Sequence, residues 1–173
     1  MLERFRKLRR NRAVVDTLYA AIVADARAPD LYQDSGLPDT VMGRFESLSI
    51  HVFLFLARCR DDAGLKALAQ DLVDRFIRDV EDSIREIGVG DPSVPKRMRK
   101  LAGMFYERVA AYDAPLRTGD AAGLGAALLC LALPVERAQE AGLRLATYMM
   151  AQKAALDAVR TEDITAGRLD AKE

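Results

Sequence analysis

Few side chains in this sequence have the chemistry of a catalytic group. The single histidine is His51, and the two cysteines are Cys59 and Cys130. A thiol in contact with an imidazole can form a nucleophilic pair. However, His51 and Cys59 lie eight residues apart in one predicted helix, which separates them by about 12 Å along its axis. We therefore predict a structural role for His51, two buried and reduced thiols, and no catalytic residue.

The sequence also lacks the usual signatures of cofactor and metal sites. It contains no HExxH, CxxC or Walker motif. Residues 88–90, Gly-Val-Gly, match a dinucleotide-binding loop only in part, because the third glycine is missing and a helix is predicted before them. A di-iron bundle needs two histidines, and the chain has one. We expect no cofactor, no metal and no enzymatic activity.

Four cations instead stand together at the beginning of a predicted helix, namely Lys96, Arg97, Arg99 and Lys100. A helix N-terminus is already positive, so each exposed cation there costs about 0.3 to 1 kcal/mol. The cluster is either a solvated face or a surface for an anionic partner. Tyr106, beside it, could contact that partner or cover the edge of the core. The predicted partner surface comprises Arg85, Gly88, Val89, Gly90, Asp91, Lys96, Arg97, Arg99, Lys100 and Tyr106.

Part of this surface belongs to a pattern that resembles a known family. The matching residues are Leu37, Pro38, Asp39, Thr40, Gly43, Arg44, Phe45 and His51, residues 85–91, and then Val94, Lys96, Arg97, Met98, Phe105, Tyr106, Arg108 and Tyr112. On these residues the chain resembles a bacterial member of the ubiquinol-cytochrome c reductase assembly chaperones. The resemblance covers roughly residues 16 to 150 and is densest in REIGVGD and VPKRM.

The resemblance implies a helical, non-catalytic chaperone of the respiratory chain. Its client would be cytochrome b or an assembly intermediate of complex III. The ribosome and a small partner protein are further contacts that the family implies.

Apolar residues recur at helical spacing along the chain, and no useful strand-type alternation occurs. We predict an all-α fold, one domain over residues 1–173, with about six helices at 2–27, 40–60, 61–87, 94–117, 121–133 and 134–160. The helix at 40–60 is apolar on two faces, so we place it at the buried centre of the bundle. Gly88 should end the third helix and Ser93 should cap the fourth. From Thr161 the periodicity ends, and we expect residues 161–173 to form a mobile tail.

Acid-base pairs at i,i+4 should stabilise the helix at 61–87. They are Asp71 with Arg75, Asp74 with Arg78, and Glu81 with Arg85.

The composition is that of an ordinary globular protein, with 173 residues, 50% hydrophobic and 30% charged, and zero formal net charge. Attraction to nucleic acid or membrane must therefore be local. No run of about 20 apolar residues and no secretory signal occurs, so we expect no transmembrane span. Residues 1–15 form a basic amphipathic start, and residues 2–12 could lie on an anionic membrane or be solvated. We expect a cytoplasmic protein, at most peripheral on the cytoplasmic face of the inner membrane.

Two other functions stay open on the residues alone. One is a binding protein for an apolar small molecule, held beside the helix at 121–133 in a pocket lined by Phe53, Leu124, Leu128 and Met149. A close-packed core at these four residues would remove it. The other is a ribosome- or RNA-directed adaptor, whose binding would weaken steeply with salt.

Overall fold

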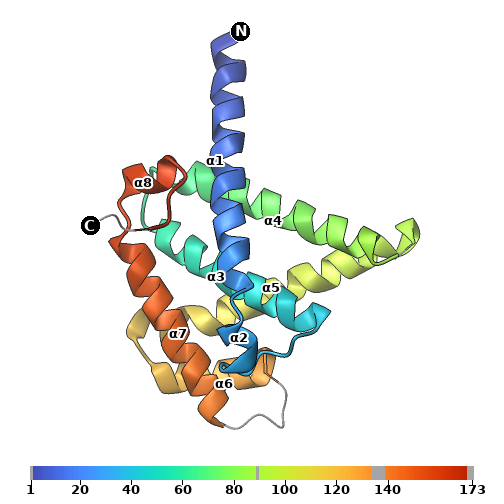
Figure 1. Ribbon diagram of the computed structural model, residues 1–173, viewed down its shortest axis with the longest axis vertical. Helices are drawn as coiled ribbons and strands as arrows, with labels where there is room; N and C mark the ends of the chain where they lie inside the picture. Colours follow the sequence, from blue (N-terminus) through green and yellow to red (C-terminus); the bar gives the residue numbers. More distant parts are fainter. Residues whose placement is uncertain (1, 89, 134–138, 171–173) are drawn as a thin grey trace.

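Helix α3 (Val41–Cys59) lies at the centre of the protein, in a computed structural model that describes residues 2–88, 90–133 and 139–170 (Figure 1). It packs against α1 (Leu2–Ala26), α4 (Lys66–Glu86), α5 (Val94–Thr118) and α7 (Gln139–Ala158). Every residue from 50 to 55 is buried, which requires neighbours on all sides of the helix. The prediction of a central, buried helix is confirmed.

The remaining elements are short. Helix α6 (Ala121–Leu131) forms a hairpin with α7, and both pack on the central helices. Helices α2 (Asp30–Gln33) and α8 (Thr161–Thr165) and a 3-10 turn at Asp91–Ser93 complete the described part of the chain, which has no strand. The all-α, single-domain prediction is confirmed, but about six helices was too few. Helices of four or five residues are too short to show a hydrophobic period.

Helices α4 and α5 form a hairpin that projects from the bundle (Figure 1). Helix α4 ends at Glu86, and Gly88 takes the left-handed conformation with φ +83°, which glycine adopts without a Cβ penalty. Helix α5 begins after Ser93 as predicted, although the Ser93 hydroxyl makes no capping hydrogen bond. Gly119, with φ +73°, ends α5, and the Asp120 carboxylate accepts from the Gly123 N–H at 2.8 Å to begin α6.

The predicted start of α4 at Asp61 or Asp62 is wrong. The Asp62 carboxylate accepts from the Gly64 N–H at 2.9 Å and from the Thr161 hydroxyl, so it stabilises a turn instead of capping a helix. The Thr161 hydrogen bond, with help from Gly64 and Arg58, lowers the pKa of Asp62. The helix therefore begins only at Lys66.

The chain after Thr161 is more regular than the sequence predicted. Helix α8 buries Ile164 completely, and Arg160 donates to the Asp163 carboxylate at 2.8 Å. Arg58 of α3 donates to the Leu156 and Val159 carbonyls at 3.1 and 2.9 Å, and so holds the end of α7. These partners lie about a hundred residues away in sequence, which local periodicity cannot reveal. Residues 171–173 lie outside the described chain.

Only part of the predicted ladder on α4 forms. Arg85 donates to Glu81 at 2.8 Å as expected. Arg78, by contrast, bonds the backbone carbonyl of Asp74. Arg75 turns toward α1, where it bonds Asp16 at 3.1 Å and lies 4.7 Å from the centre of the Tyr19 ring. A tertiary contact thus replaces the predicted Asp71–Arg75 pair.

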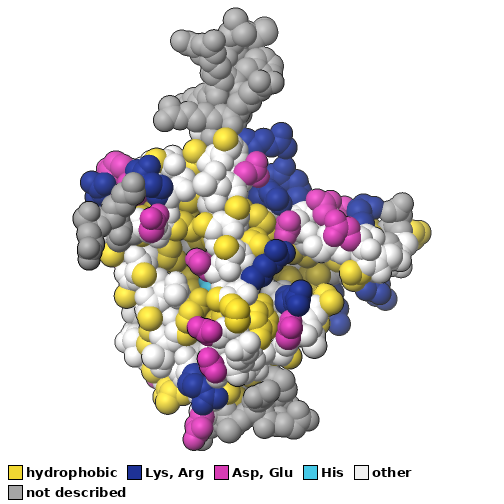
Figure 2. All heavy atoms as spheres, viewed as in Figure 1, with side chains coloured by type: hydrophobic (Ala, Val, Ile, Leu, Met, Phe, Trp, Pro, Cys, Tyr) yellow, Lys and Arg dark blue, Asp and Glu magenta, His cyan; other side chains and the backbone are white. Residues whose placement is uncertain are grey.

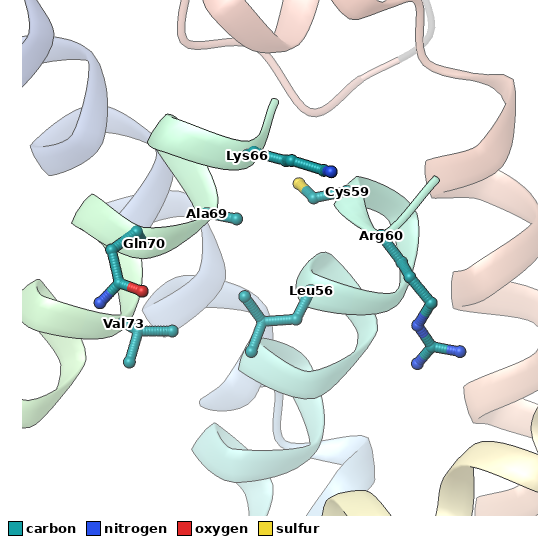
Figure 3. A pocket seen from close by; sticks show the side chains of 7 residues that line it. All are labelled: Leu56, Cys59, Arg60, Lys66, Ala69, Gln70 and Val73. Carbon is teal, nitrogen blue, oxygen red and sulfur yellow. The ribbon is translucent and has the colours of Figure 1, made fainter. Parts of the chain in front are cut away.

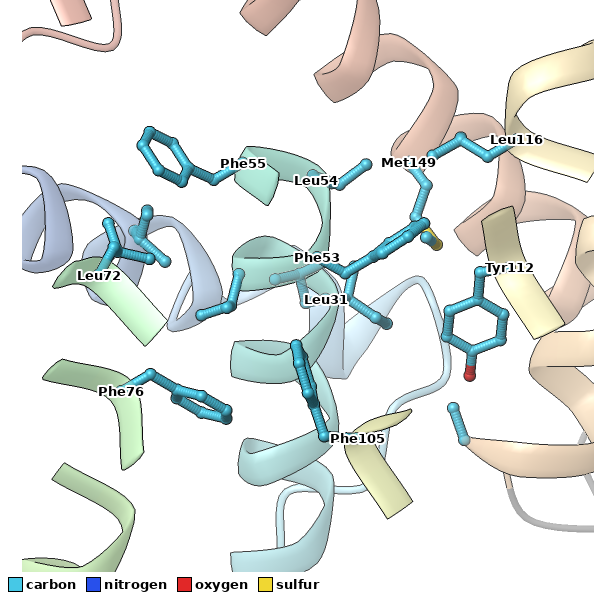
Figure 4. Packing of buried hydrophobic residues seen from close by; sticks show 14 of the residues in the cluster. Leu31, Phe53, Leu54, Phe55, Leu72, Phe76, Phe105, Tyr112, Leu116 and Met149 are labelled. Atoms are coloured by element: carbon cyan, nitrogen blue, oxygen red, sulfur yellow. The ribbon is translucent and has the colours of Figure 1, made fainter. Parts of the chain in front are cut away.

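The core is aromatic where α3, α4 and α5 meet (Figure 4). Phe76 lies 5.3 Å from Phe105, and Phe53 meets Tyr112 edge to face at 6.1 Å, measured between ring centres. The predicted small-molecule pocket beside α6 is instead close-packed core, because Phe53, Leu124, Leu128 and Met149 are all at most 2% exposed. Helices α6 and α7 are also in close backbone contact, since a Cβ on Gly142 would lie 2.6 Å from the Gly125 carbonyl oxygen.

Candidate partner-binding site

The predicted basic surface lies on the projecting hairpin. Lys96, Arg97, Arg99 and Lys100 are all exposed, and none of them pairs with an acid among the side chains that the structure describes. Tyr106 is 66% exposed. Gly88 and Gly90 are exposed in the connecting loop, and Arg85 pairs with Glu81. Val89 and the side chain of Asp91 lie outside the described part of the chain.

The four cations do not share one face of α5. Successive residues turn about 100° around a helix, so Lys100 and Arg97 lie about 160° and 140° around α5 from Ala102. Arg99 lies only about 60° from Ala102. Arg99 is therefore the cation of the cluster that stands beside the residues facing α4.

Between α4 and α5 lies an apolar groove of about 240 Å³, which was not predicted from the sequence. Its walls and floor are formed by Phe45, Val73, Phe76, Ile77, Val80, Met98, Arg99, Leu101, Ala102, Phe105 and Tyr106. Phe45 comes from α3, and its ring stacks on Phe76 at 6.3 Å. Figure 2 shows hydrophobic side chains in the opening between the hairpin and the first turns of α3. The signal available in the sequence was Val73 and Ile77, which widen the apolar face of α4.

A buried ion pair holds α5 against α3. Both Glu46 and Arg108 are 5% exposed. The Arg108 Nε and Nη2 donate to the two Glu46 carboxylate oxygens at 2.7 and 2.5 Å, and Nη2 also reaches the Leu131 carbonyl at 2.7 Å. The sequence did contain a signal for this pair, because Arg108 falls at a stripe position between Phe105 and Tyr112. The pair fixes the helix that carries one wall of the groove.

The two cysteines differ from each other. Cys59 is buried beside a second pocket of about 190 Å³ near Lys66 and Gln70 (Figure 3). Burial raises the pKa of its thiol to about 12, which makes it a poor nucleophile at neutral pH. Cys130 is exposed, so the prediction that both thiols are buried is wrong for Cys130. The described residues contain no group of three or more His, Cys, Asp or Glu side chains placed to hold a metal ion.

His51 has the structural role that was predicted. Its Nδ1 lies 2.7 Å from the Ser47 carbonyl oxygen and its Nε2 lies 2.7 Å from the Tyr148 hydroxyl. A carbonyl can only accept, so Nδ1 carries the proton and Nε2 accepts from Tyr148. Burial lowers the pKa of His51 below its ordinary value of 6.5. The neutral ring therefore joins α3 to α7.

This arrangement predicts that stability decreases at mildly acidic pH. The unfolded chain binds a proton at His51 near pH 6.5, whereas the folded chain does so only at lower pH. The contribution of neutral His51 to the free energy of unfolding is therefore complete above pH 6.5 and is lost as the pH falls below it. The slope should be at most about 1.4 kcal/mol per pH unit. Urea unfolding at about pH 7.5 and about pH 5.5 measures it.

A His51→Gln variant is the matched control, because His51 is the only histidine of the chain. This variant should show a clearly smaller change in unfolding free energy between the two pH values. Equal stability of the unmodified protein at both values would contradict the prediction.

Within the described residues, no helix has the length and apolar character needed to cross a membrane.

The fold and the surface together define the class of protein: it is an all-α bundle whose projecting hairpin holds an exposed apolar groove. Grooves of this kind can bind a helix of another protein. The chain belongs to the ubiquinol-cytochrome C chaperone family, whose model matches residues 33–171. The resemblance noted in the sequence is thereby confirmed.

Two similar proteins extend this result. The crystal structure of the Cbp3 homolog from Brucella abortus is 40% identical, with a TM-score of 0.87, and the match covers 100% of this chain and 97% of that one. Ubiquinol-cytochrome-c reductase complex assembly factor 1 from Xenopus laevis is 26% identical over 105 residues, which are 60% of this chain and 52% of the relative. The chain thus matches about half the length of that curated relative.

Proposed function

We propose that this protein is a non-catalytic assembly chaperone that holds cytochrome b, or an assembly intermediate of ubiquinol-cytochrome c reductase. Membership of the family and the name of the Xenopus laevis relative support ubiquinol-cytochrome c reductase as the complex whose assembly this protein serves. The structural observation that carries the binding role is the exposed hairpin. It places an apolar groove next to cations that have no acidic partner among the described side chains.

The partner surface that we propose is the one predicted from the sequence, namely Arg85, residues 88–91, the four cations of α5, and Tyr106. Its exposed positions lie on one projecting element. Such an element can reach a client while the bundle stays folded. A small partner protein or the ribosome could use the same face, and binding through cations would then weaken steeply with salt.

Membrane contact is a separate part of the proposal. Residues 2–12 contain six Lys or Arg residues, and each cation near an anionic surface contributes about 1 kcal/mol. This would place the protein in the cytoplasm, peripheral on the inner membrane. Flotation with vesicles of anionic lipid, compared with zwitterionic vesicles, tests this contact. Equal flotation with both would contradict it.

Charge reversal of the four cations of α5 should abolish the chaperone function. In a strain lacking the gene, we expect cytochrome b and reductase activity to fall, and the unmodified gene to restore both. A gene encoding Lys96→Glu, Arg97→Glu, Arg99→Glu and Lys100→Glu should leave cytochrome b near the level of the deletion strain. The electrostatic attraction to an anionic client is reversed in this variant. Immunoblotting and quinol oxidation measure the two outcomes.

A matched control reverses four exposed cations elsewhere, Arg27, Lys66, Arg117 and Arg144. This control should complement. A deletion that leaves cytochrome b unchanged would refute the proposed function, and full complementation by the first variant would refute only the role of these four cations.

A further inference from the structure

The groove between α4 and α5 is apolar yet open to solvent. Ile77 of α4 is 41% exposed and Tyr106 of α5 is 66% exposed, one on each wall. Exposed apolar patches on a soluble protein mark sites of interaction. The floor is well packed, because the Phe45 ring stacks on Phe76 and the Phe105 ring lies tilted against Phe76 at 5.3 Å. The groove is therefore a preformed site rather than an opening in loose packing.

Its size indicates what it can hold. Pockets for drug-sized molecules measure about 300 to 1,000 Å³, whereas this groove measures about 240 Å³. That volume suits one or two large side chains inserted by a partner, which is how an amphipathic helix binds a hydrophobic groove. The size thus favours a protein segment over a bulky apolar cofactor.

Charge on the two rims indicates which helix fits. Arg99 lines the groove on the α5 side without an acidic partner among the described side chains. On the α4 side, Asp74 and Glu81 lie three and four residues from Ile77 and so flank it on the helix surface. A partner helix with a carboxylate beside its apolar face would place that carboxylate against Arg99. If the partner helix bound in the reverse orientation, its carboxylate would instead lie toward the like-charged Asp74 and Glu81.

We propose that this groove binds an amphipathic helix of the client. Two large apolar side chains spaced i,i+3 or i,i+4 enter the groove, and an Asp or Glu one turn away pairs with Arg99. The identification of the partner rests on the proposed function. The groove, and not the whole basic cluster, then selects the segment that is bound, because Lys100 and Arg97 lie on other faces of α5.

A peptide array tests the proposal. Purified full-length protein is applied to immobilised 20-residue peptides that cover cytochrome b of the same organism. We expect binding to a few peptides that combine the apolar spacing with an acid. Replacing that acid by Lys should reduce binding at least about tenfold, as loss of a charge-assisted contact does. Arg99→Glu should recover binding to the Lys peptide.

Two groove variants provide the critical comparison. Ala102→Phe fills the groove and Ile77→Asp makes its wall polar; both should lose binding while thermal unfolding shows that they remain folded. Arg117→Glu, at an exposed position near the other end of the same helix, should bind like the unmodified protein. Unchanged binding by both groove variants, or binding to no peptide, would overturn the proposal.

Cells separate this proposal from the proposed function. Full complementation by a folded Ala102→Phe variant, in a strain whose cytochrome b depends on the gene, would reject the groove and keep the chaperone function. The groove proposal would also be rejected if the unmodified protein formed a dimer that is lost only in the Ala102→Phe or Ile77→Asp variant. A second copy of the chain would then occupy the groove.

Discussion

Replacing Arg108 by Ala should destabilise the protein by about 3 to 5 kcal/mol, the usual effect of leaving one member of a buried ion pair without its partner. Glu46 is 5% exposed, and Arg108 supplies hydrogen bonds to both of its carboxylate oxygens. The substitution also removes the donors to the Met104 and Leu131 carbonyls. Of the changes considered, this one should have the largest effect on stability.

Equilibrium urea unfolding measures this effect, with the slope used to check that the transition stays cooperative. The control is the double variant Glu46→Leu with Arg108→Met, which replaces the pair by apolar side chains of similar volume. It should recover most of the lost stability, because well-packed apolar residues often match or exceed a buried ion pair. If Arg108→Ala lowered the unfolding free energy by less than about 1 kcal/mol, Glu46 could not be buried as described.

Gly43→Ala should be nearly as damaging, at about 3 kcal/mol. A Cβ at this position would lie 1.8 Å from the Pro38 carbonyl oxygen and 2.9 Å from its carbon. Both are backbone atoms, so no side-chain rotation relieves the clash. The first turn of α3 would have to move, which would also disturb the Thr40 hydroxyl that accepts from the Gly43 N–H at 3.1 Å. Losing such a cap alone costs about 1 kcal/mol.

Gly103→Ala is the matched control for this prediction. Gly103 also lies within a helix, but a Cβ there would meet nothing within 4 Å. Alanine is favoured over glycine inside a helix by about 0.8 to 1 kcal/mol, so this variant should unfold at a higher temperature. Thermal denaturation followed by circular dichroism compares the two variants. A loss of stability in both would show that alanine is harmful for a reason other than the contact with Pro38.

The long helices could be predicted because their signals are local. The central position of α3 followed from apolar residues on two of its faces, and the hairpin followed from Gly88 and Ser93. The start of α4 could not be predicted, because Asp62 is a good N-cap by type. Its carboxylate instead accepts from the Gly64 N–H and from Thr161, which lies about a hundred residues away in sequence. Helix α8 was missed since its single buried apolar residue, Ile164, shows no hydrophobic period.

The candidate site was predicted only in part for a similar reason. The sequence identified the basic residues as an exposed cluster and left Tyr106 as either a partner contact or part of the edge of the core, but it treated them as one surface. The groove depends on Phe45, which reaches it from another helix. The ion pair of Glu46 and Arg108 joins positions 62 residues apart. In the sequence, each is a charged residue that interrupts the apolar stripe of its helix. Two charged residues of opposite sign on buried helix faces that contact each other indicate an ion pair. Which faces contact each other is known only once the packing of the helices is known.

The central position of α3 has a consequence for biosynthesis. Its contacts reach forward to Tyr148 and to the carbonyls at the end of α7, at separations of 97 to 101 residues. While the chain leaves the ribosome, the helix that covers the last face of α3 is made only after this interval of residues. The apolar surface on that face must therefore stay uncovered, or be held by another protein, until α7 has been made. A protein of a chaperone family would then itself depend on protection while it is being made.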